Sequence, residues 1–320
     1  AGAPAAALEA PPQELAHHRD TGTDFDVVVL TNLGRDHLDL HESMESYFRA
    51  KAALFDSDLA AKGAANVDDP YGQLLLDVAS IDMTEFGRDQ VADVEVGVAS
   101  HEFTWRGQRV RVPLGGDFNV MNSLAALTAA TLLDIPPAEA ASGLADVTPV
   151  PGRFETVSDP CRHSVTVVVD YAHTPDGLEE LLRAARRLVP DGRLLAVFGC
   201  AGDRDVEKRA PMGAVGARLA DLPIVTSDNP RGEDPRSIVD QVVDGADATD
   251  RHKVHAEIDR RAAIAHAIRS AETGDLIVVA GKGHETTQTI GGESRPFDDR
   301  VVSRELLDEL AAIDMTGEPS

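Results

Sequence analysis

The chain has 320 residues, of which 42% are hydrophobic, so it is long enough for two domains with their own cores. Its net charge of −25 comes from 55 acidic and 30 basic residues and argues against binding nucleic acid or an anionic membrane through a basic surface. No stretch of about eighteen apolar residues occurs, so we expect no membrane span. Two cysteines make no disulfide framework, and a reducing cytoplasm is the simplest location.

The first half of the chain mixes strand and helix patterns. Residues 25–32 form a continuous apolar run, which is typical of a buried parallel strand. Residues 41–55 have apolar spacing near 3.6, which predicts a helix that carries Lys51, one of only five lysines. Residues 94–114 alternate around a glycine turn and predict an antiparallel hairpin. Residues 116–135 and the segment after them predict two helices.

The second half alternates strictly between strands and helices. Each apolar strand is expected to lead into a helical segment, which is the pattern of an open α/β domain with a mainly parallel sheet. We therefore predict an α/β fold with a domain boundary near residue 155. The four strand segments begin at residues 165, 193, 222 and 275.

Polar residues stand at the end of each of these four strands. Parallel sheets bind ligands at this edge, so the four loops predict a site for a charged, polar ligand. One such loop alone would be explained as a polar turn, but four in succession favour a functional site. The residues are Asp170, His173 and Asp176 after the first strand, then residues 199–205, 227–231 and 281–285.

Eight motifs, in matching order and spacing, resemble landmarks of the Mur ligase family, and most closely its diaminopimelate-adding (MurE-type) branch. The resemblance covers about residues 8–310. It implies a partial central, ATP-binding domain over residues 1–155 and a Rossmann-like, amino-acid-binding C-terminal domain over residues 156–320. The motifs are TNLGRDHLDLH…YFRAKAALF, NVDDPYG, GDFNVMNSLAAL, PGRFE, VVVDYAHTPDGL, FGCAGDRD…KR, SDNPR and GKGHE.

The resemblance implies an ATP-dependent ligase that joins meso-diaminopimelate to UDP-N-acetylmuramoyl-L-Ala-D-Glu through an acyl phosphate, in peptidoglycan precursor synthesis. ATP and Mg²⁺ are the implied cofactors, with Glu9, His37 and a carbamoylated Lys51 as metal ligands. Without the motif, Lys51 would be a helix lysine whose stem covers apolar surface, and His37 a strand-end cap or a core histidine. No protein partner is indicated.

The same resemblance implies the nucleotide contacts. Asn119 matches the asparagine near adenine, and Arg153 matches an arginine whose fork can hold two phosphate oxygens. Asp170 and His173 match residues that contact ribose and phosphate. The alternative for each is a hydrogen bond or salt bridge at a domain junction. Arg19 matches an arginine that contacts the sugar nucleotide.

Residues 228–231, Asp-Asn-Pro-Arg, resemble the signature of enzymes that add diaminopimelate. Arg231 is expected to form a bidentate pair with the distal carboxylate, which lysine lacks. Alone, this stretch would be explained as an Asx–Pro turn. The implied amino-acid site comprises Arg204, Asp228, Asn229, Pro230, Arg231, Gly281 and Glu285.

Two parts of the family pattern find no match in this sequence: the N-terminal UDP-sugar domain and the glycine-rich P-loop that ends in Gly-Lys-Thr. Two explanations remain open. The sequence is a fragment of a full ligase with little activity alone, or it is a non-catalytic diaminopimelate-binding remnant or partner-dependent module.

Overall fold

The computed structural model describes residues 5–10, 24–34 and 43–316. The chain forms two compact units, each built from several segments. The first unit draws on Ala1–Val94, Phe103–Val110 and Val120–Ala145; the second draws on Glu95–Glu102, Arg111–Asn119 and Asp146–Ser320. The predicted α/β class is confirmed, and the domain boundary near residue 155 stays a prediction.

The first unit contains a parallel sheet of β1 (Phe25–Leu30), β2 (Ala60–Asn66) and β3 (Asp82–Phe86), in that order. Helices α2 (Met44–Ala52) and α3 (Pro70–Val78) pack on it through a core that includes Val28, Phe48 and Leu75. The predicted strand at residues 25–32 and the helix that carries Lys51 are therefore confirmed. A capping box between Ser43 and Ser46 begins α2.

A second, three-stranded sheet consists of β4 (Val91–Val96), β5 (His101–Trp105) and β6 (Gln108–Val112). Arg106 and Gly107, with φ of 47° and 75°, form the two-residue turn between β5 and β6, which confirms the predicted hairpin. The two helices predicted after it are α4 (Phe118–Leu132) and α5 (Pro137–Ala145). Single-turn 3₁₀ helices are Ala53–Phe55, Arg88–Gln90 and Arg251–Lys253.

The second unit is built on a six-stranded sheet in the order β11-β10-β9-β12-β8-β7. All its strand pairs are parallel except β7 with β8, so the mainly parallel sheet is confirmed. The strands are β7 (Glu155–Thr156), β8 (Thr166–Asp170), β9 (Leu194–Phe198), β10 (Leu222–Val225), β11 (His255–Ala256) and β12 (Leu276–Ala280).

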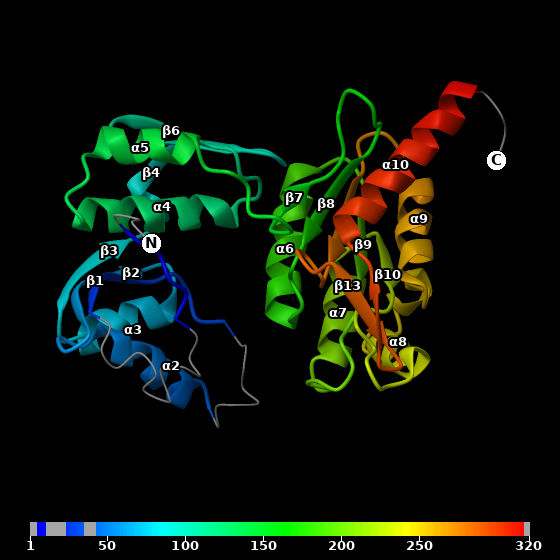
Figure 1. The fold of residues 1–320 in the computed structure, drawn as a ribbon, viewed down its shortest axis with the longest axis horizontal. Helices are drawn as coiled ribbons and strands as arrows, with labels where there is room; N and C mark the ends of the chain where they lie inside the picture. The colour runs from blue at the N-terminus through cyan, green and yellow to red at the C-terminus, as the bar shows by residue number, and fades with distance from the viewer. Residues whose placement is uncertain (1–4, 11–23, 35–42, 317–320) are drawn as a thin grey trace. The chain divides into compact units, whose positions relative to one another are not determined.

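Helices cover both faces of this sheet (Figure 1). Buried residues of α6, α7 and α8 form one apolar core against it, and those of α9 and α10 form the other. The three-layer arrangement buries both faces, as continuous apolar strands require. The helices are α6 (Pro175–Leu188), α7 (Arg209–Leu219), α8 (Pro235–Asp244), α9 (Arg260–Ser270) and α10 (Asp299–Thr316).

One expectation for this unit is wrong. The strand that begins at residue 275 does not lead directly into a helix, because a hairpin of β13 (Thr287–Ile290) and β14 (Glu293–Pro296) precedes α10. Gly291 and Gly292 turn this hairpin with φ of 58° and 82°, a backbone conformation that glycine adopts without strain. The Gly–Gly pair between short polar strands is the sequence signal that predicts it.

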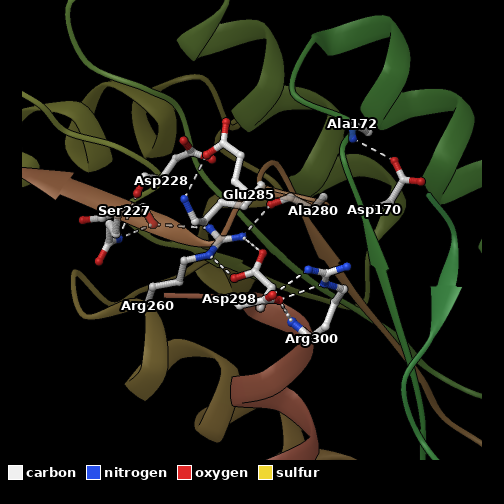
Figure 2. A network of polar contacts seen from close by, with 12 residues as sticks. Asp170, Ala172, Ser227, Asp228, Arg260, Ala280, Glu285, Asp298 and Arg300 are labelled. Atoms are coloured by element: carbon white, nitrogen blue, oxygen red, sulfur yellow. Dashed lines mark hydrogen bonds and ion pairs between the residues drawn. The ribbon is translucent and has the colours of Figure 1, made fainter. Parts of the chain in front are cut away.

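A buried arginine ties two helices on one face of the sheet to the sheet edge. Arg260, at the start of α9, bonds both carboxylate oxygens of Asp299, at the start of α10, at 2.8 and 2.7 Å. Its other bonds go to the carbonyls of Ser227 at 3.3 Å and Ala280 at 2.9 Å, so Figure 2 shows it between the ends of β10 and β12. Both charges are fully buried and therefore depend on each other.

We predict that Asp299→Ala lowers the free energy of unfolding by about 3–5 kcal/mol, because it leaves the Arg260 charge buried without a partner. The control is Glu305→Ala, which breaks the exposed pair with Arg261 and is expected to cost less than about 1 kcal/mol. Urea unfolding followed by circular dichroism measures both. Equal shifts of the two midpoints would contradict the assignment.

Helices α7 and α8 pack so closely that Gly213 has no room for a side chain: an added Cβ would lie 1.7 Å from the carbonyl oxygen of Val242. Gly143 in α5 has nothing within 4 Å of the same position. We expect Gly213→Ala to destabilise the protein by about 1–3 kcal/mol through overpacking. Gly143→Ala should stabilise it by about 0.5–1 kcal/mol, because alanine favours the helix. Thermal unfolding that gave both variants the same sign would refute this account.

Candidate active site

Four strand ends meet at one edge of the six-stranded sheet. Because β8, β12, β9 and β10 are adjacent and parallel, the loops that follow them leave from the same side. The order of connection reverses between β9 and β12, which is where open α/β sheets place their ligand sites. The residues predicted at the strand ends lie in these loops.

The loops after β9 and β10 are bonded to each other through their backbones. Gly202 N–H donates to the carbonyl of Asn229 at 2.9 Å, and Gly232 N–H donates to the Asp203 carboxylate at 3.0 Å. Asp203 N–H donates in turn to the carboxylate of Glu233 at 2.6 Å. The two loops therefore behave as one structural piece.

Arg209 reinforces this connection. It is buried and holds the two oxygens of Glu233 at 2.8 and 3.0 Å in a bidentate pair. The hydrogen bond from Arg209, and then the backbone N–H of Asp203, lower the pKa of Glu233. Arg209 lies in the motif that follows the second strand, but its pairing with Glu233 was not predicted, because an ion pair between separate loops leaves no periodic signal in the sequence.

Two arginines on these loops have no acidic partner among the described residues. Arg204 is exposed, and Arg231 is half-buried with one weak bond, at 3.5 Å, to the carbonyl of Gly202. The backbone of Arg231 is held in the left-handed region, with φ of 54°, by a bond from its N–H to the Thr289 carbonyl at 2.8 Å. Guanidinium groups without an acidic partner suit a carboxylate or phosphate ligand.

Acidic and amide groups lie at the ends of β10 and β12. Asn229 donates to the Glu285 carboxylate at 2.7 Å and to the Asp228 carboxylate at 3.2 Å. Burial raises the pKa of Asp228, although Arg260 and Lys282 oppose the rise. For Glu285, burial is outweighed by the hydrogen bond and charge of Lys282, and the pKa is lowered. Figure 2 shows Asp228 and Glu285 close together beyond Arg260.

Gly281 and Pro230 are structural parts of the same edge. Gly281 has φ of 117°, and a Cβ there would lie 2.7 Å from the Asp228 carboxylate, so only glycine fits. The Pro230 carbonyl accepts the N–H of Glu233 at 3.0 Å. The structure therefore brings together Arg204, Asp228, Asn229, Pro230, Arg231, Gly281 and Glu285, as the sequence predicted for one edge; their contacts with a ligand stay a prediction.

A second cluster forms around Tyr171, just after β8. Arg153 stacks on the Tyr171 ring with 4.5 Å between guanidinium carbon and ring centre. The rings of His173 and His284 lie 4.6 and 5.2 Å from it. Lys208 donates to the His173 carbonyl at 2.9 Å. Arg153 and two histidines therefore contact one aromatic ring, and Lys208 is bonded to the backbone of one of these histidines.

Asp170 is buried at the end of β8 and accepts the backbone N–H of Phe154 at 2.7 Å. It also accepts the backbone N–H of Ala172 at 2.7 Å (Figure 2). Burial raises its pKa, and these two bonds, with the Arg153 charge, oppose the rise. Its carboxylate therefore holds the segment with Arg153 against β8. Asn119, in the first turn of α4, is buried and donates to the Gly115 carbonyl at 2.6 Å.

The predicted magnesium ligands lie in the first unit. Lys51 is half-buried in the last turn of α2, with its amine 5.7 Å from the centre of the Tyr47 ring, and Glu9 is exposed. His37, like Arg19, lies outside the described residues. Within residues 5–10, 24–34 and 43–316, no group of three His, Cys, Asp or Glu side chains could hold a metal. The assignment of Glu9, His37 and carbamoylated Lys51 as magnesium ligands therefore stays a prediction.

Comparison with known families matches both parts of the chain. Residues 1–130 match the Mur ligase middle domain, and residues 152–283 match the Mur ligase glutamate ligase domain. Relatives named UDP-N-acetylmuramoyl-L-alanyl-D-glutamate–2,6-diaminopimelate ligase include those of Streptomyces coelicolor and Thermosynechococcus vestitus. Both are 44% identical, over 96% and 94% of this chain and 63% and 62% of their own lengths. The chain thus spans less than two thirds of these curated relatives.

Solved structures give the same result. A structure with the same ligase name is 36% identical, with a TM-score of 0.60 over 95% of this chain and 64% of its own. Folylpolyglutamate synthase of Mycobacterium tuberculosis, 21% identical over 92% of this chain and 64% of its own, shares the fold with a TM-score of 0.62. The chain therefore belongs to the Mur ligase family and carries its middle and C-terminal domains.

Proposed function

We propose that this chain supplies the ATP-binding and amino-acid-binding parts of a ligase that adds meso-diaminopimelate to UDP-N-acetylmuramoyl-L-alanyl-D-glutamate. The main support for this proposal is the arrangement of charged side chains at the edge of the six-stranded sheet. Arg204 and Arg231 lack acidic partners among the described residues, while Glu285 uses only one carboxylate oxygen in bonds to Asn229 and Lys282. Such a site suits a ligand end that carries both a carboxylate and an ammonium group.

In this proposal Arg231 forms a bidentate pair with the distal carboxylate of diaminopimelate, and Glu285 accepts a hydrogen bond from the distal ammonium group. Arg204 adds a second positive charge for the carboxylate. Lysine lacks this carboxylate and would leave Arg231 unpaired in a half-buried position, so the site discriminates against it. The names of the relatives, which specify diaminopimelate, support this choice.

We assign phosphate binding to the cluster around Tyr171. Arg153 and Lys208 supply positive charge, and His173 supplies a ring nitrogen. Bound ATP would supply the phosphoryl group that activates the substrate carboxylate for attack by the amine. Asp170 fixes the segment that carries Arg153, and Asn119 is proposed near the adenine. Glu9, His37 and carbamoylated Lys51 remain the proposed magnesium ligands.

We place this reaction in the cytoplasm. Cys161 and Cys200 are both free thiols, which favours a reducing compartment. Burial raises the pKa of Cys200 to about 12, so this thiol stays protonated and unreactive. Among the described residues, the helices are all too short or too polar to cross a membrane.

We predict that Arg231→Lys weakens binding of meso-diaminopimelate at least about tenfold, because lysine loses the bidentate pair and a charge-assisted hydrogen bond contributes about 1.5–3 kcal/mol. Isothermal titration calorimetry on the 320-residue chain measures this, with L-lysine as the comparison ligand. Arg236→Lys is the matched control, since Arg236 is exposed on α8 without an acidic partner in the described chain. Unchanged affinity in Arg231→Lys would remove the specificity argument.

The 320-residue chain itself should release little phosphate from ATP with both substrates present, because its sequence has no Gly-Lys-Thr phosphate-binding loop. A coupled phosphate assay tests this, with the full-length Streptomyces coelicolor relative as the positive control. Sustained phosphate release by the chain would contradict the prediction and require a second way to hold the phosphates. Diaminopimelate binding without turnover would fit both a fragment and a binding module.

A further inference from the structure

We propose that Lys282 is a positioning residue for the amino-acid site: it holds one oxygen of Glu285 and fixes the amide of Asn229, so that the other Glu285 oxygen faces an incoming ammonium group. The identity of that ammonium group rests on the proposed function. That Lys282 orients the Asn229 amide and keeps Glu285 ionised rests on contacts within this chain.

Lys282 is fully buried, which is unusual for a lysine. Its ammonium group donates to the Thr287 carbonyl at 2.7 Å, to Glu285 Oε2 at 3.0 Å and to Asn229 Oδ1 at 3.4 Å. Three protons thus meet three acceptors, which satisfies the group. Gly281 and Gly283 on either side have φ of 117° and 52°. The backbone can therefore turn sharply enough to direct this lysine inward.

The same contacts determine how the Asn229 amide is oriented. Its oxygen accepts from Lys282 and from the N–H of Thr289 at 3.0 Å. Both of these groups can only donate, so the oxygen must face them. The NH₂ group is therefore directed at Glu285 Oε2 and Asp228 Oδ1, which can only accept when they are ionised. A flipped amide would set donor against donor.

Glu285 is anchored at one end and open at the other. Oε2 receives both Lys282 and Asn229, while no donor among the described residues reaches Oε1. The side chain is 36% exposed, so it is partly open to solvent. This is the arrangement needed to accept a hydrogen bond from an ammonium group without moving the carboxylate.

The charges around this pair show why the lysine matters. The groups that act on Glu285 and on its neighbour Asp228 are Lys282, His284, Arg260 and Asp299. Burial opposes ionisation of Glu285, and Lys282 is the main group that lowers its pKa, ahead of Asn229 and His284. Without Lys282, burial and the Asp228 charge are opposed only by Asn229 and His284. The pKa of Glu285 would then rise.

The first test measures the pKa of Glu285 by carbon-13 NMR of its carboxyl group, assigned with Glu285→Gln. In Lys282→Met, which keeps an unbranched side chain one atom shorter, the pKa should rise by at least about one pH unit. Lys253→Met is the matched control: Lys253 pairs with Asp250 at the same three-residue spacing, 3.2 Å apart, but is more exposed. An unchanged pKa in folded Lys282→Met would overturn the proposal.

The wild-type chain offers a measurement that does not depend on the variant folding. The protons on Lys282 Nζ should exchange slowly with water, and the nitrogen-15 chemical shift of Nζ should change as Glu285 titrates. Rapid exchange, or no shift, would overturn the proposal. A purely structural lysine would be slow to exchange, but the pKa of Glu285 would not respond to its loss.

The second test is calorimetric binding of meso-diaminopimelate between pH 8 and pH 5. Wild-type affinity should stay nearly constant, because the lowered pKa of Glu285 keeps it ionised over this range. In Lys282→Met the affinity should fall more steeply toward pH 5 than in the wild type, as protonation removes the acceptor. Equal pH profiles would refute the positioning role. If wild-type chain binds no diaminopimelate, the proposed function fails, and the NMR titration still decides the role of Lys282.

Discussion

The site in the second unit depends on one buried arginine. Arg260 bonds the carbonyls of Ser227 and Ala280, which directly precede Asp228 and Gly281 in the chain. Its pair with Asp299 anchors both contacts to the starts of α9 and α10. The distance between the ends of β10 and β12 is therefore fixed by the buried Arg260–Asp299 pair and not by the residues that would contact a ligand. Asp228, Asn229, Lys282 and Glu285 all follow within a few residues of these two strand ends.

A second constraint concerns charge. An amino-acid site needs a free positive group and a free negative group that do not neutralise each other. Ion pairs within the chain keep these groups apart. Arg209 pairs with Glu233, and Lys282 pairs with one carboxylate oxygen of Glu285. Arg231 is then left without an acidic partner in the described chain. The price is two buried cations, each of which is stabilised by its own carboxylate.

Part of this could be predicted from the sequence. The apolar runs predicted β1, β8, β9, β10 and β12. The last four are buried on both faces, which requires a nearly continuous apolar sequence, whereas β1 is only partly buried. Because polar residues directly follow these apolar runs, the sequence also predicted that the site residues lie at the ends of the strands. The Arg209–Glu233 and Arg260–Asp299 pairs could not be predicted, since they join positions 24 and 39 residues apart with no periodic signal. The β13–β14 hairpin was missed because its polar strands carry only a Gly–Gly turn as a signal.

The most direct test of the account is a crystal structure of the chain with meso-diaminopimelate bound. We predict that the distal carboxylate lies on Arg231 with two hydrogen bonds, and that the distal ammonium lies about 3 Å from Glu285 Oε1. Asn229 and Lys282 should keep their present contacts. A ligand bound away from β10 and β12, or one whose ammonium group turns toward Arg231, would contradict the assignment of the site.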